Sequence, residues 1–390
     1  MTADLLSERA RTARSSAVRD LLRLTEQPHV LSLAGGLPAP QMLPVEAIRR
    51  ATLEVLDRLG PAALQYGPTE GISPLRAMVG ARLGDPALSE GTVITTGSQQ
   101  ALDLVARVLL DPGDVVVAET PTYLGALSAL HWQQPVIEGV IGDRDGMRTD
   151  VLADRLADGL RPKMVYVVTE FANPTGATMS LERRHHLAAL AERYGFVIVE
   201  DDPYGALRFR GTRHPPIRTW SDRVVTLGSA SKVLAPGLRV GWLTAPDWLA
   251  RPVVIAKQAA DLHTATLNQQ LVLAMLGDDE WFSAHVAAIV AFYGIRAECL
   301  QRSLRVHLGD AIEFSAPDGG MFVWGQMTDP LLLTGPLLER AVEQGVAFVP
   351  GSAFRHDAVD DGTLRLCFTT LDAEQLDEAA RRLARAVTGG

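Results

Sequence analysis

The sequence predicts an α/β protein in which helices cover a mostly parallel sheet, followed by a smaller α+β region. Between about residues 90 and 245, short apolar runs alternate with segments of helical periodicity. Such runs are typical of strands buried on both faces, and their alternation with helices is typical of parallel sheets. After about residue 270 the pattern becomes a mixture of helices and short strands. We therefore expect a second, smaller α+β domain.

The apolar runs and the helical periodicity locate the elements of the first part of the chain. Buried strands are expected at 115–118, 164–168, 196–199, 224–227 and 240–244. Helices are expected at 99–110 and 181–194, where apolar residues recur every three or four positions. Ligands bind beyond the carboxyl ends of the strands in sheets of this kind. That edge is where we look for a functional site.

The C-terminal part is expected to begin near residue 270. A helical segment through Arg302 precedes short strand candidates at 320–324, 347–349 and 364–368. The 390 residues suffice for two domains. We expect a large domain at 46–270 and a small domain at 271–390.

Composition and charge argue against several classes of protein. Acidic residues outnumber basic ones by 46 to 37, which disfavours a broad nucleic-acid or anionic-membrane surface. The two cysteines, Cys299 and Cys367, form no C-x-x-C pair, so neither a disulfide framework nor a metal site is predicted. The N-terminus has no continuous apolar segment, and no stretch reaches the roughly 18 apolar residues of a membrane span. We expect a cytoplasmic protein.

One lysine has the most informative surroundings in the chain. Lys232 lies in the string GSASKVLAPGLRVGW, at 228–242, just after an expected strand. Ser229 and Ser231 precede it, and a Pro-Gly turn allows Arg239 to return towards it. An amine beside hydroxyls and a guanidinium suits a phosphorylated aldehyde, because the amine forms a Schiff base and the other groups bind the phosphate. Pyridoxal phosphate is such a molecule.

The complete string resembles the lysine signature of the class I/II aminotransferases, which are fold-type I pyridoxal phosphate enzymes. An isolated S-x-S-K would fit a surface lysine equally well, but further strings extend the resemblance from about residue 15 to 370. The resemblance implies the aspartate aminotransferase-like fold, with a mostly parallel seven-stranded sheet in the large domain. It also implies a homodimer that uses pyridoxal 5′-phosphate.

Three strings resemble the parts of the family that hold the cofactor. TTGSQQALDL would present Ser98 as a helix cap, and the outward amides of residues 98–100 would form a phosphate cradle with Ser98 and Gln99 beside it. ETPTYLGAL places Tyr123 where relatives stack a ring on the cofactor, and FANPTG offers Asn173 to its phenolic oxygen. Taken singly, these motifs would also fit an ordinary cap, a core tyrosine and a surface turn.

A cluster of acids follows the strand expected at 196–199. The string VIVEDDPYGALRF contains Glu200, Asp201 and Asp202. A carboxylate beside the pyridine nitrogen keeps it protonated and makes the ring an electron sink. The family spacing of aspartate and tyrosine implies Asp201 for this role and Tyr204 as a donor to the phenolic oxygen.

The resemblance also implies a set of substrate-binding residues. Arg365, in LRLCFTT, corresponds to the arginine that forms a bidentate pair with the substrate carboxylate, and Asn173 and Gly36 line the same site. Gly36 belongs to LSLAGGLPAP, which resembles the 2-aminoadipate and kynurenine aminotransferase subgroup. In that subgroup Arg19 would meet a distal carboxylate of the substrate, although Arg14 and Arg23 are close rivals and a solvated helix charge is the plainer alternative.

Two N-terminal features imply a neighbouring subunit and an arm. Tyr66, in LQYGPTEGISPLR, corresponds to a tyrosine that crosses a dimer interface to the neighbour's phosphate. Residues 1–45 would form an arm that contributes to the small domain and the substrate pocket.

We therefore expect a pyridoxal phosphate-dependent aminotransferase in which Lys232 forms the Schiff base and then moves a proton from the substrate Cα. Asp201 and Tyr204 would be its other catalytic residues. Another fold-type I reaction, such as cyclisation, β-elimination or decarboxylation, uses the same cofactor residues. A ligand-sensing regulator would need an N-terminal DNA-binding module, and only about 30 residues precede LSLAGG.

Overall fold

A single large sheet organises the first two thirds of the chain. The computed structural model describes residues 5–12 and 29–389, and within them this sheet has eight strands in the order β2-β9-β8-β7-β6-β3-β4-β5. The strands are β2 (Thr92–Thr95), β3 (Val115–Thr120), β4 (Val136–Asp143), β5 (Gly146–Met147), β6 (Met164–Val168), β7 (Val197–Asp201), β8 (Val224–Ser229) and β9 (Gly241–Thr244). The five predicted strands are all present. The sheet contains the seven strands expected and adds β5, a two-residue strand at its edge.

The sheet is mostly parallel, as predicted. Strands β8, β7, β6, β3 and β4 run parallel, and β9 is antiparallel to both β2 and β8. Alternate residues of β6 explain why its sequence is continuously apolar. Tyr166 and Val168 face one hydrophobic core, while Val165 and Val167 face another. Both faces of this strand are therefore buried.

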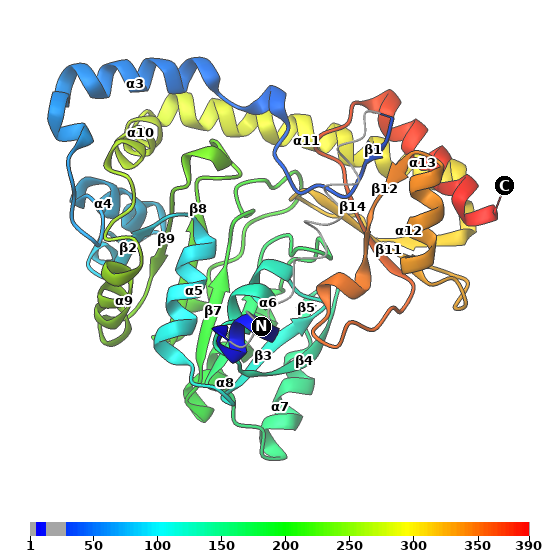
Figure 1. Ribbon diagram of the computed structural model, residues 1–390, viewed down its shortest axis with the longest axis horizontal. Helices are drawn as coiled ribbons and strands as arrows, with labels where there is room; N and C mark the ends of the chain where they lie inside the picture. The colour runs from blue at the N-terminus through cyan, green and yellow to red at the C-terminus, as the bar shows by residue number, and fades with distance from the viewer. Residues whose placement is uncertain (1–4, 13–28, 390) are drawn as a thin grey trace.

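Helices cover the two faces of the large sheet. Those bordering it are α5 (Ser98–Leu109), α6 (Leu124–His131), α7 (Thr149–Ala157), α8 (Leu181–Tyr194) and α9 (Asp247–Ala260). The predicted helix at 181–194 matches α8, and the one at 99–110 begins and ends one residue earlier, as α5. Helices α3 (Val45–Leu59), α4 (Ser73–Arg82) and α10 (Thr266–Gly277) pack together beside the β2 edge (Figure 1).

The last third of the chain builds a smaller antiparallel sheet. Described residues form it in the order β10-β11-β14-β13, from β10 (Ile312–Phe314), β11 (Phe322–Met327), β14 (Thr363–Cys367) and β13 (Val349–Pro350). Helices α12 (Thr334–Glu343) and α13 (Ala373–Thr388) lie beside it. Near the other end of the chain, β1 (Leu31–Ser32) pairs in parallel with β12 (Val346–Ala347). The α+β character predicted for this region is confirmed.

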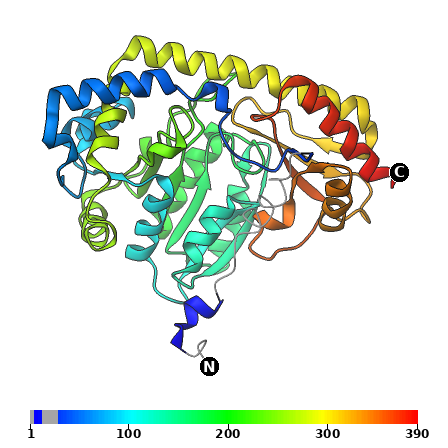
Figure 2. The same cartoon turned by 45° about the horizontal axis from the view of Figure 1, so that its top comes forward.

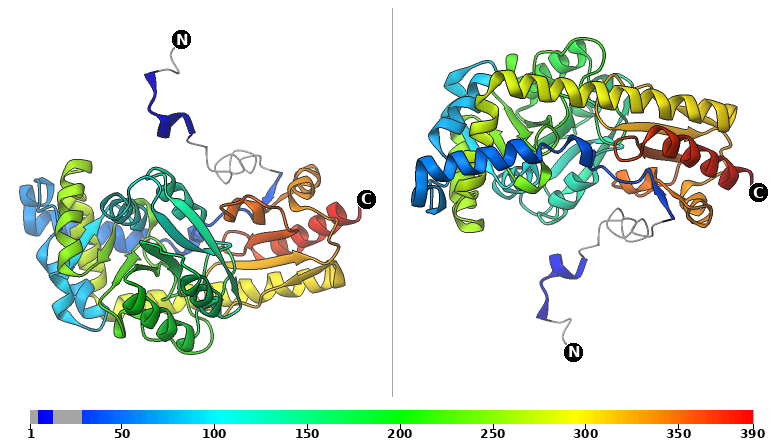
Figure 3. Two further views of the ribbon diagram at one scale, coloured as in Figure 1. Left: turned by 90° about the horizontal axis from the view of Figure 1, so that it is seen from below. Right: turned by 90° about the horizontal axis from the view of Figure 1, so that it is seen from above.

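One long helix extends along both sheets. Helix α11 (Asp279–His307) runs from the side of α10 to the small sheet, where it packs on α13 (Figures 1 and 2). Among the described residues, it is the one helix that is long and apolar enough to cross a membrane, judged by length and mean hydropathy alone. Its buried residues Ile289, Tyr293, Leu300 and Leu304 belong to the main hydrophobic core. Figure 3 shows α13 and the C-terminus at the opposite end of the molecule from α3 and α4.

Helix α13 begins with a capping box whose contribution to stability can be tested. The Asp372 side chain accepts from the Gln375 amide at 2.9 Å, and the Gln375 side chain accepts from the Asp372 amide at 3.0 Å. We expect Asp372→Ala to lower the free energy of unfolding by about 1 kcal/mol, because an orphan helix amide loses its acceptor. Urea denaturation measures this change. Asp372→Asn keeps a capping oxygen and should remain near wild type, and equal losses in both variants would contradict the role of the cap.

Candidate active site

A cavity of about 300 Å³ opens at the carboxyl ends of the central strands. Its lining contains most of the residues that the sequence singled out, namely Gly36, Ser98, Gln99, Tyr123, Asn173, Asp201, Tyr204, Ser229, Ser231, Lys232, Arg239 and Arg365. They come from loops, strands and the first turn of α5, and are up to 329 positions apart, since Gly36 and Arg365 lie in one lining. Neighbouring parallel strands that end at the same edge of the large sheet bring most of these residues together, while Gly36 and Arg365 reach the cavity from the N-terminal segment and the small sheet.

Lys232 lies inside this cavity with its amine partly buried. Its Nζ donates to the Gly36 carbonyl oxygen at 3.2 Å. Burial lowers the pKa of Lys232 to about 8, and the positive charges of Arg365 and Arg239 act in the same direction. A neutral, nucleophilic amine is therefore available much closer to physiological pH than in a solvated lysine.

Asp201, at the end of β7, is a buried carboxylate with one unpartnered oxygen. Its Oδ2 accepts from the Tyr166 hydroxyl at 2.8 Å, while Oδ1 is buried without a hydrogen-bond partner among the described residues. Burial raises the pKa of Asp201 to about 7, and the Tyr166 hydrogen bond opposes that rise. Buried acceptors are nearly always paired, so this oxygen in a cavity wall is suited to a donor on a ligand.

The two neighbouring acids point elsewhere. Glu200 accepts from the Thr169 hydroxyl and from the Ile217 amide, both at 3.0 Å, on the side away from the cavity. Asp202 accepts from the Gly205 amide at 2.7 Å and pairs with Arg213. Of the three acids in this string, Asp201 alone lines the cavity.

The start of α5 lines the same cavity as Lys232, and its geometry is suited to an anion. Gly97 has φ +83°, and a Cβ there would lie 2.5 Å from Nη2 of Arg239, so glycine lets the guanidinium approach the turn. The first amides of α5 have no acceptor within the helix and carry the positive end of its dipole. Ser98 was expected as the cap, and this is wrong: Gly97 is the N-cap residue and Ser98 is the first helical residue. From that position its hydroxyl cannot cap the helix, and Ser98 lines the cavity instead.

Arg365 is held rigidly at the opposite wall. Its Nη1 donates to Asn173 Oδ1 at 2.9 Å, and Nη2 donates to the carbonyl oxygens of Ala34 and Gly35 at 2.6 and 2.8 Å. The guanidinium lies 4.3 Å from the centre of the Phe322 ring and 4.9 Å from that of Phe354. These two rings fix its plane.

Aromatic and small residues complete the cavity. The Tyr123 hydroxyl donates to Gln99 Oε1 at 3.4 Å, and burial raises the pKa of Tyr123. Burial also raises the pKa of Tyr204, whose ring meets Phe322 edge to face with centroids 5.9 Å apart. A Cβ on Gly36 would lie 3.4 Å from the Phe322 ring, so this glycine preserves space beside Arg365.

Two predicted residues are not part of this cavity. The Tyr66 residue is 78% exposed, and its ring contacts His263 edge to face at 5.6 Å, in a separate cavity. Within one chain Tyr66 therefore does not join the other candidates. Arg19 lies outside the described residues, as do Arg14 and Arg23.

Sequence reasoning missed Tyr166, which orients Asp201. The signal was a single hydroxyl within the apolar strand at 164–168. Its partner became visible only through the pairing of β6 with β7, which sets Val168 opposite Asp201 and Tyr166 two residues before it. A residue with no motif of its own could not be assigned from one sequence.

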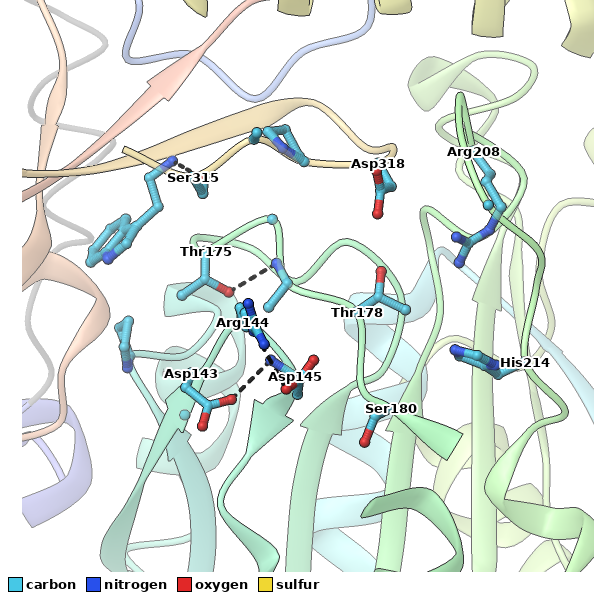
Figure 4. Close-up of a pocket in the computed structure, with 18 of the residues that line it drawn as sticks. Asp143, Arg144, Asp145, Thr175, Thr178, Ser180, Arg208, His214, Ser315 and Asp318 are labelled. Carbon is cyan, nitrogen blue, oxygen red and sulfur yellow. Dashed lines mark hydrogen bonds and ion pairs between the residues drawn. The ribbon is translucent and has the colours of Figure 1, made fainter. Parts of the chain in front are cut away.

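A larger cavity, of about 780 Å³, has a different lining, which includes Thr175, Thr178 and Ser315 (Figure 4). Arg208 and His214 lie along one side, and Asp143, Arg144 and Asp145 along another (Figure 4). It contains no lysine and none of the predicted site residues. Among the residues that the structure describes, no group of three or more His, Cys, Asp or Glu side chains is placed to hold a metal ion. The amine, carboxylate and guanidinium groups meet in the smaller cavity.

Comparison with known proteins supports the same chemistry. Residues 28–383 match the family model described as aminotransferase class I and II. Aromatic-amino-acid aminotransferase 1 of Thermococcus litoralis is 41% identical over 98% of this chain and 93% of its own length. The kynurenine aminotransferase of Pyrococcus horikoshii, solved in complex with PMP, superposes with a TM-score of 0.94 at 39% identity, covering 99% of this chain and 98% of that one.

A third relative shows the cofactor's phosphopyridoxyl group directly. The α-aminoadipate aminotransferase of Thermus thermophilus, solved with N-(5′-phosphopyridoxyl)-L-leucine, superposes with a TM-score of 0.92 at 39% identity, covering 100% of this chain and 98% of that one. The chain belongs to the class I and II aminotransferases. It is an enzyme that transfers amino groups and uses pyridoxal 5′-phosphate, and the predicted aspartate aminotransferase-like fold is confirmed.

The low pKa of Lys232 leads to a prediction about loading of the cofactor. The sequence predicts this lysine as the attachment point, and only a neutral amine attacks an aldehyde. The rate at which pyridoxal phosphate binds the apoenzyme should therefore rise with pH and level off above a midpoint of about 8. Stopped-flow absorbance measures that rate, with N-α-acetyl-lysine as a solvated reference whose rate should keep rising towards about pH 10.4. A protein profile that follows the reference would contradict the lowered pKa.

Proposed function

We propose that the enzyme moves the amino group of an α-amino acid to a 2-oxo acid, with Lys232 as both the cofactor's attachment point and the proton carrier. The observation that carries this proposal is the unpartnered Oδ1 of buried Asp201 in the same cavity as the low-pKa amine of Lys232. A ring N–H would satisfy that oxygen, and an aldehyde would react with that amine.

The cavity residues fit the parts of pyridoxal phosphate. Its phosphate would be held by the positive end of α5, by the guanidinium of Arg239 and by the polar residues Ser98, Gln99, Ser229 and Ser231. Tyr123 would stack on the ring, while Asn173 and Tyr204 would donate to its phenolic oxygen. When bound, the cofactor supplies an aldehyde that condenses with amines and a ring that accepts the electron pair left at the substrate Cα.

Lys232 and Asp201 would divide the catalytic work. The Lys232 amine would act as the base that takes the proton from the substrate Cα and as the acid that gives it back on the cofactor side. Its pKa of about 8 suits this exchange near neutral pH. The Asp201 carboxylate would stabilise a protonated ring nitrogen, and the Tyr166 hydroxyl holds that carboxylate in position.

Arg365 would bind the substrate's α-carboxylate. It already has two cation–π neighbours and three hydrogen bonds, so little conformational entropy is lost when the substrate binds. Next to it, Gly36, Leu37 and Leu124 line the cavity with apolar or small surface. Together with the relative named for aromatic amino acids, this lining supports an aromatic or other apolar donor.

A dicarboxylic donor is the second candidate. The relative named α-aminoadipate aminotransferase supports it, and Arg19 is the residue predicted to meet the distal carboxylate. We further propose a cytoplasmic homodimer, with an arm at 1–45, a large domain at 46–270 and a small domain at 271–390. The exposure of Tyr66 in a cavity of about 260 Å³ supports a role for this residue in a neighbouring subunit's site.

Lys232→Ala tests the proposed role of the lysine. Wild-type holoenzyme should show the visible absorbance of lysine-bound cofactor and lose it on addition of its amino donor. The variant should lack that absorbance and transfer amino groups at least about 10³-fold more slowly, because both attachment and proton transfer are lost. Spectra should be recorded with phenylalanine, kynurenine, 2-aminoadipate and glutamate. Normal turnover by the variant, or wild-type absorbance that no donor changes, would overturn the proposal.

Subunit mixing tests the proposed role of Tyr66. Neither Tyr66→Ala nor Lys232→Ala homodimers should be fully active. In a mixed dimer, one site contains Lys232 from one subunit and Tyr66 of the partner subunit, so an intact site is restored. Denaturing the two variants together and refolding them should give up to about a quarter of wild-type activity, since half of the dimers are mixed and each has one intact site. If Tyr66 served the site of its own chain, mixing would add no activity.

A further inference from the structure

An ion pair between a buried lysine and a partly exposed aspartate lies behind the start of α5, on the side away from the cavity. Lys257, in α9, is fully buried, and its Nζ donates to Oδ1 and Oδ2 of Asp261 at 2.7 and 2.9 Å. The same amine donates to Gln100 Oε1 at 3.1 Å. Burying a lysine is unfavourable unless its charge is paired and its donors are used. Neither residue of the pair lines the catalytic cavity.

The pair is connected to the phosphate cradle through Thr96. The Thr96 hydroxyl donates to Asp261 Oδ2 at 2.9 Å, and its amide donates to Gln100 Oε1 at 2.7 Å. Its carbonyl oxygen accepts from Arg239 Nη2 at 3.0 Å. The hydroxyl, the amide and the carbonyl of Thr96 are thus all held by hydrogen bonds. This network determines where the turn lies and where the Arg239 guanidinium is held.

Gln100, in the first turn of α5, binds the other members of this network. Its Nε2 donates to Asp261 Oδ2 at 2.7 Å, so the carboxylate holds both the strand end and the first turn of α5. Displacing Asp261 would release the two sides of the cradle at once.

The charge of Asp261 makes its partner necessary. An unpaired carboxylate hydrogen-bonded to Thr96 would stand just behind the amides that are proposed to receive a phosphate dianion. Like charges at such a site repel each other, and solvent screens this repulsion only in part because the Asp261 side chain is 25% exposed. With Lys257 bound to both oxygens, the pair has no net charge. The carboxylate can then position the turn without opposing the ligand.

We propose that Asp261 and Lys257 are positioning residues for phosphate binding: Asp261 holds Thr96 and Gln100, and Lys257 cancels the charge that would repel the phosphate. The inference rests on the proposed function, which places the cofactor's phosphate at the start of α5. It extends that function to residues that do not touch the cofactor.

Comparing pyridoxal phosphate with pyridoxal, which lacks the phosphate, tests this inference. Association constants for both would be measured on apoenzyme by the visible absorbance of the lysine-bound aldehyde. Lys257→Met leaves Asp261 unpaired and should weaken pyridoxal phosphate binding at least about tenfold, with pyridoxal changed less than about threefold. Adding Asp261→Asn to this variant removes the charge but keeps an acceptor for Thr96, and should restore pyridoxal phosphate binding to within about threefold of wild type.

Two further variants keep the test decisive if Lys257→Met does not fold. Asp261→Asn alone retains the Lys257 charge and an acceptor for Thr96, so pyridoxal phosphate should bind as tightly as in wild type or more tightly. Lys163→Met removes another lysine–aspartate contact, Lys163 Nζ to Asp114 Oδ2 at 2.6 Å, whose lysine is more exposed than Lys257. This contact lies at the amino ends of β6 and β3, away from the cavity, and its loss should change neither constant.

Three results would overturn the inference: equal weakening of both aldehydes by Lys257→Met, failure of the double variant to recover, or weakened pyridoxal phosphate binding in Asp261→Asn. A failure of the proposed function would look different. It would appear in the wild-type protein, as an absence of visible absorbance with either aldehyde.

Discussion

The Arg365 guanidinium is the group on which the shape of the site depends. It rises from β14 in the small sheet, donates to Asn173 in a loop of the large sheet, and donates to Ala34 and Gly35 near the start of the described chain. Three distant segments are therefore joined by one buried cation. Oxygen acceptors at Nη1 and Nη2 and the faces of Phe322 and Phe354 replace much of its water, while Nε is buried with no partner among the described residues. The same arrangement leaves it ready to receive a carboxylate.

Around this cation, burial acts in opposite directions on acids and bases. Desolvation raises the pKa of Asp201 and lowers that of Lys232, so both groups have values near neutrality within one cavity. Tyr166 limits the shift of Asp201, and the neighbouring arginines add to the shift of Lys232. The cavity therefore holds an amine that can lose its proton and a carboxylate that can accept a hydrogen bond. Both properties suit a cofactor that reacts with amines and needs a protonated ring nitrogen.

The sequence predicted the sheet, its direction and most of the cavity, because these depend on local signals. Continuous apolar runs locate strands buried on both faces, and the lysine string locates a turn at the end of one strand. Prediction from the sequence failed where the role of a residue depends on its neighbours in space. The sequence predicted Ser98 as the cap of α5, whereas the cap is Gly97. A shift of one position at the start of a helix decides whether a side-chain hydroxyl can reach a free amide, and the sequence does not define the start that closely. Tyr166 and Lys257 carried no motif, since their partners are set by strand pairing and helix packing.

The sequence by itself therefore determined the class of fold, the family to which the chain belongs and the chemical groups of the site. Residue type and order suffice for these, because amines, carboxylates and guanidinium groups keep their chemistry wherever they lie. The tertiary structure alone decided which of three adjacent acids enters the cavity, how far burial shifts the pKa of Lys232, and which side chains hydrogen-bond to the residues at the start of α5. Desolvation and hydrogen bonding depend on neighbours in space, and a linear order of residues does not specify them.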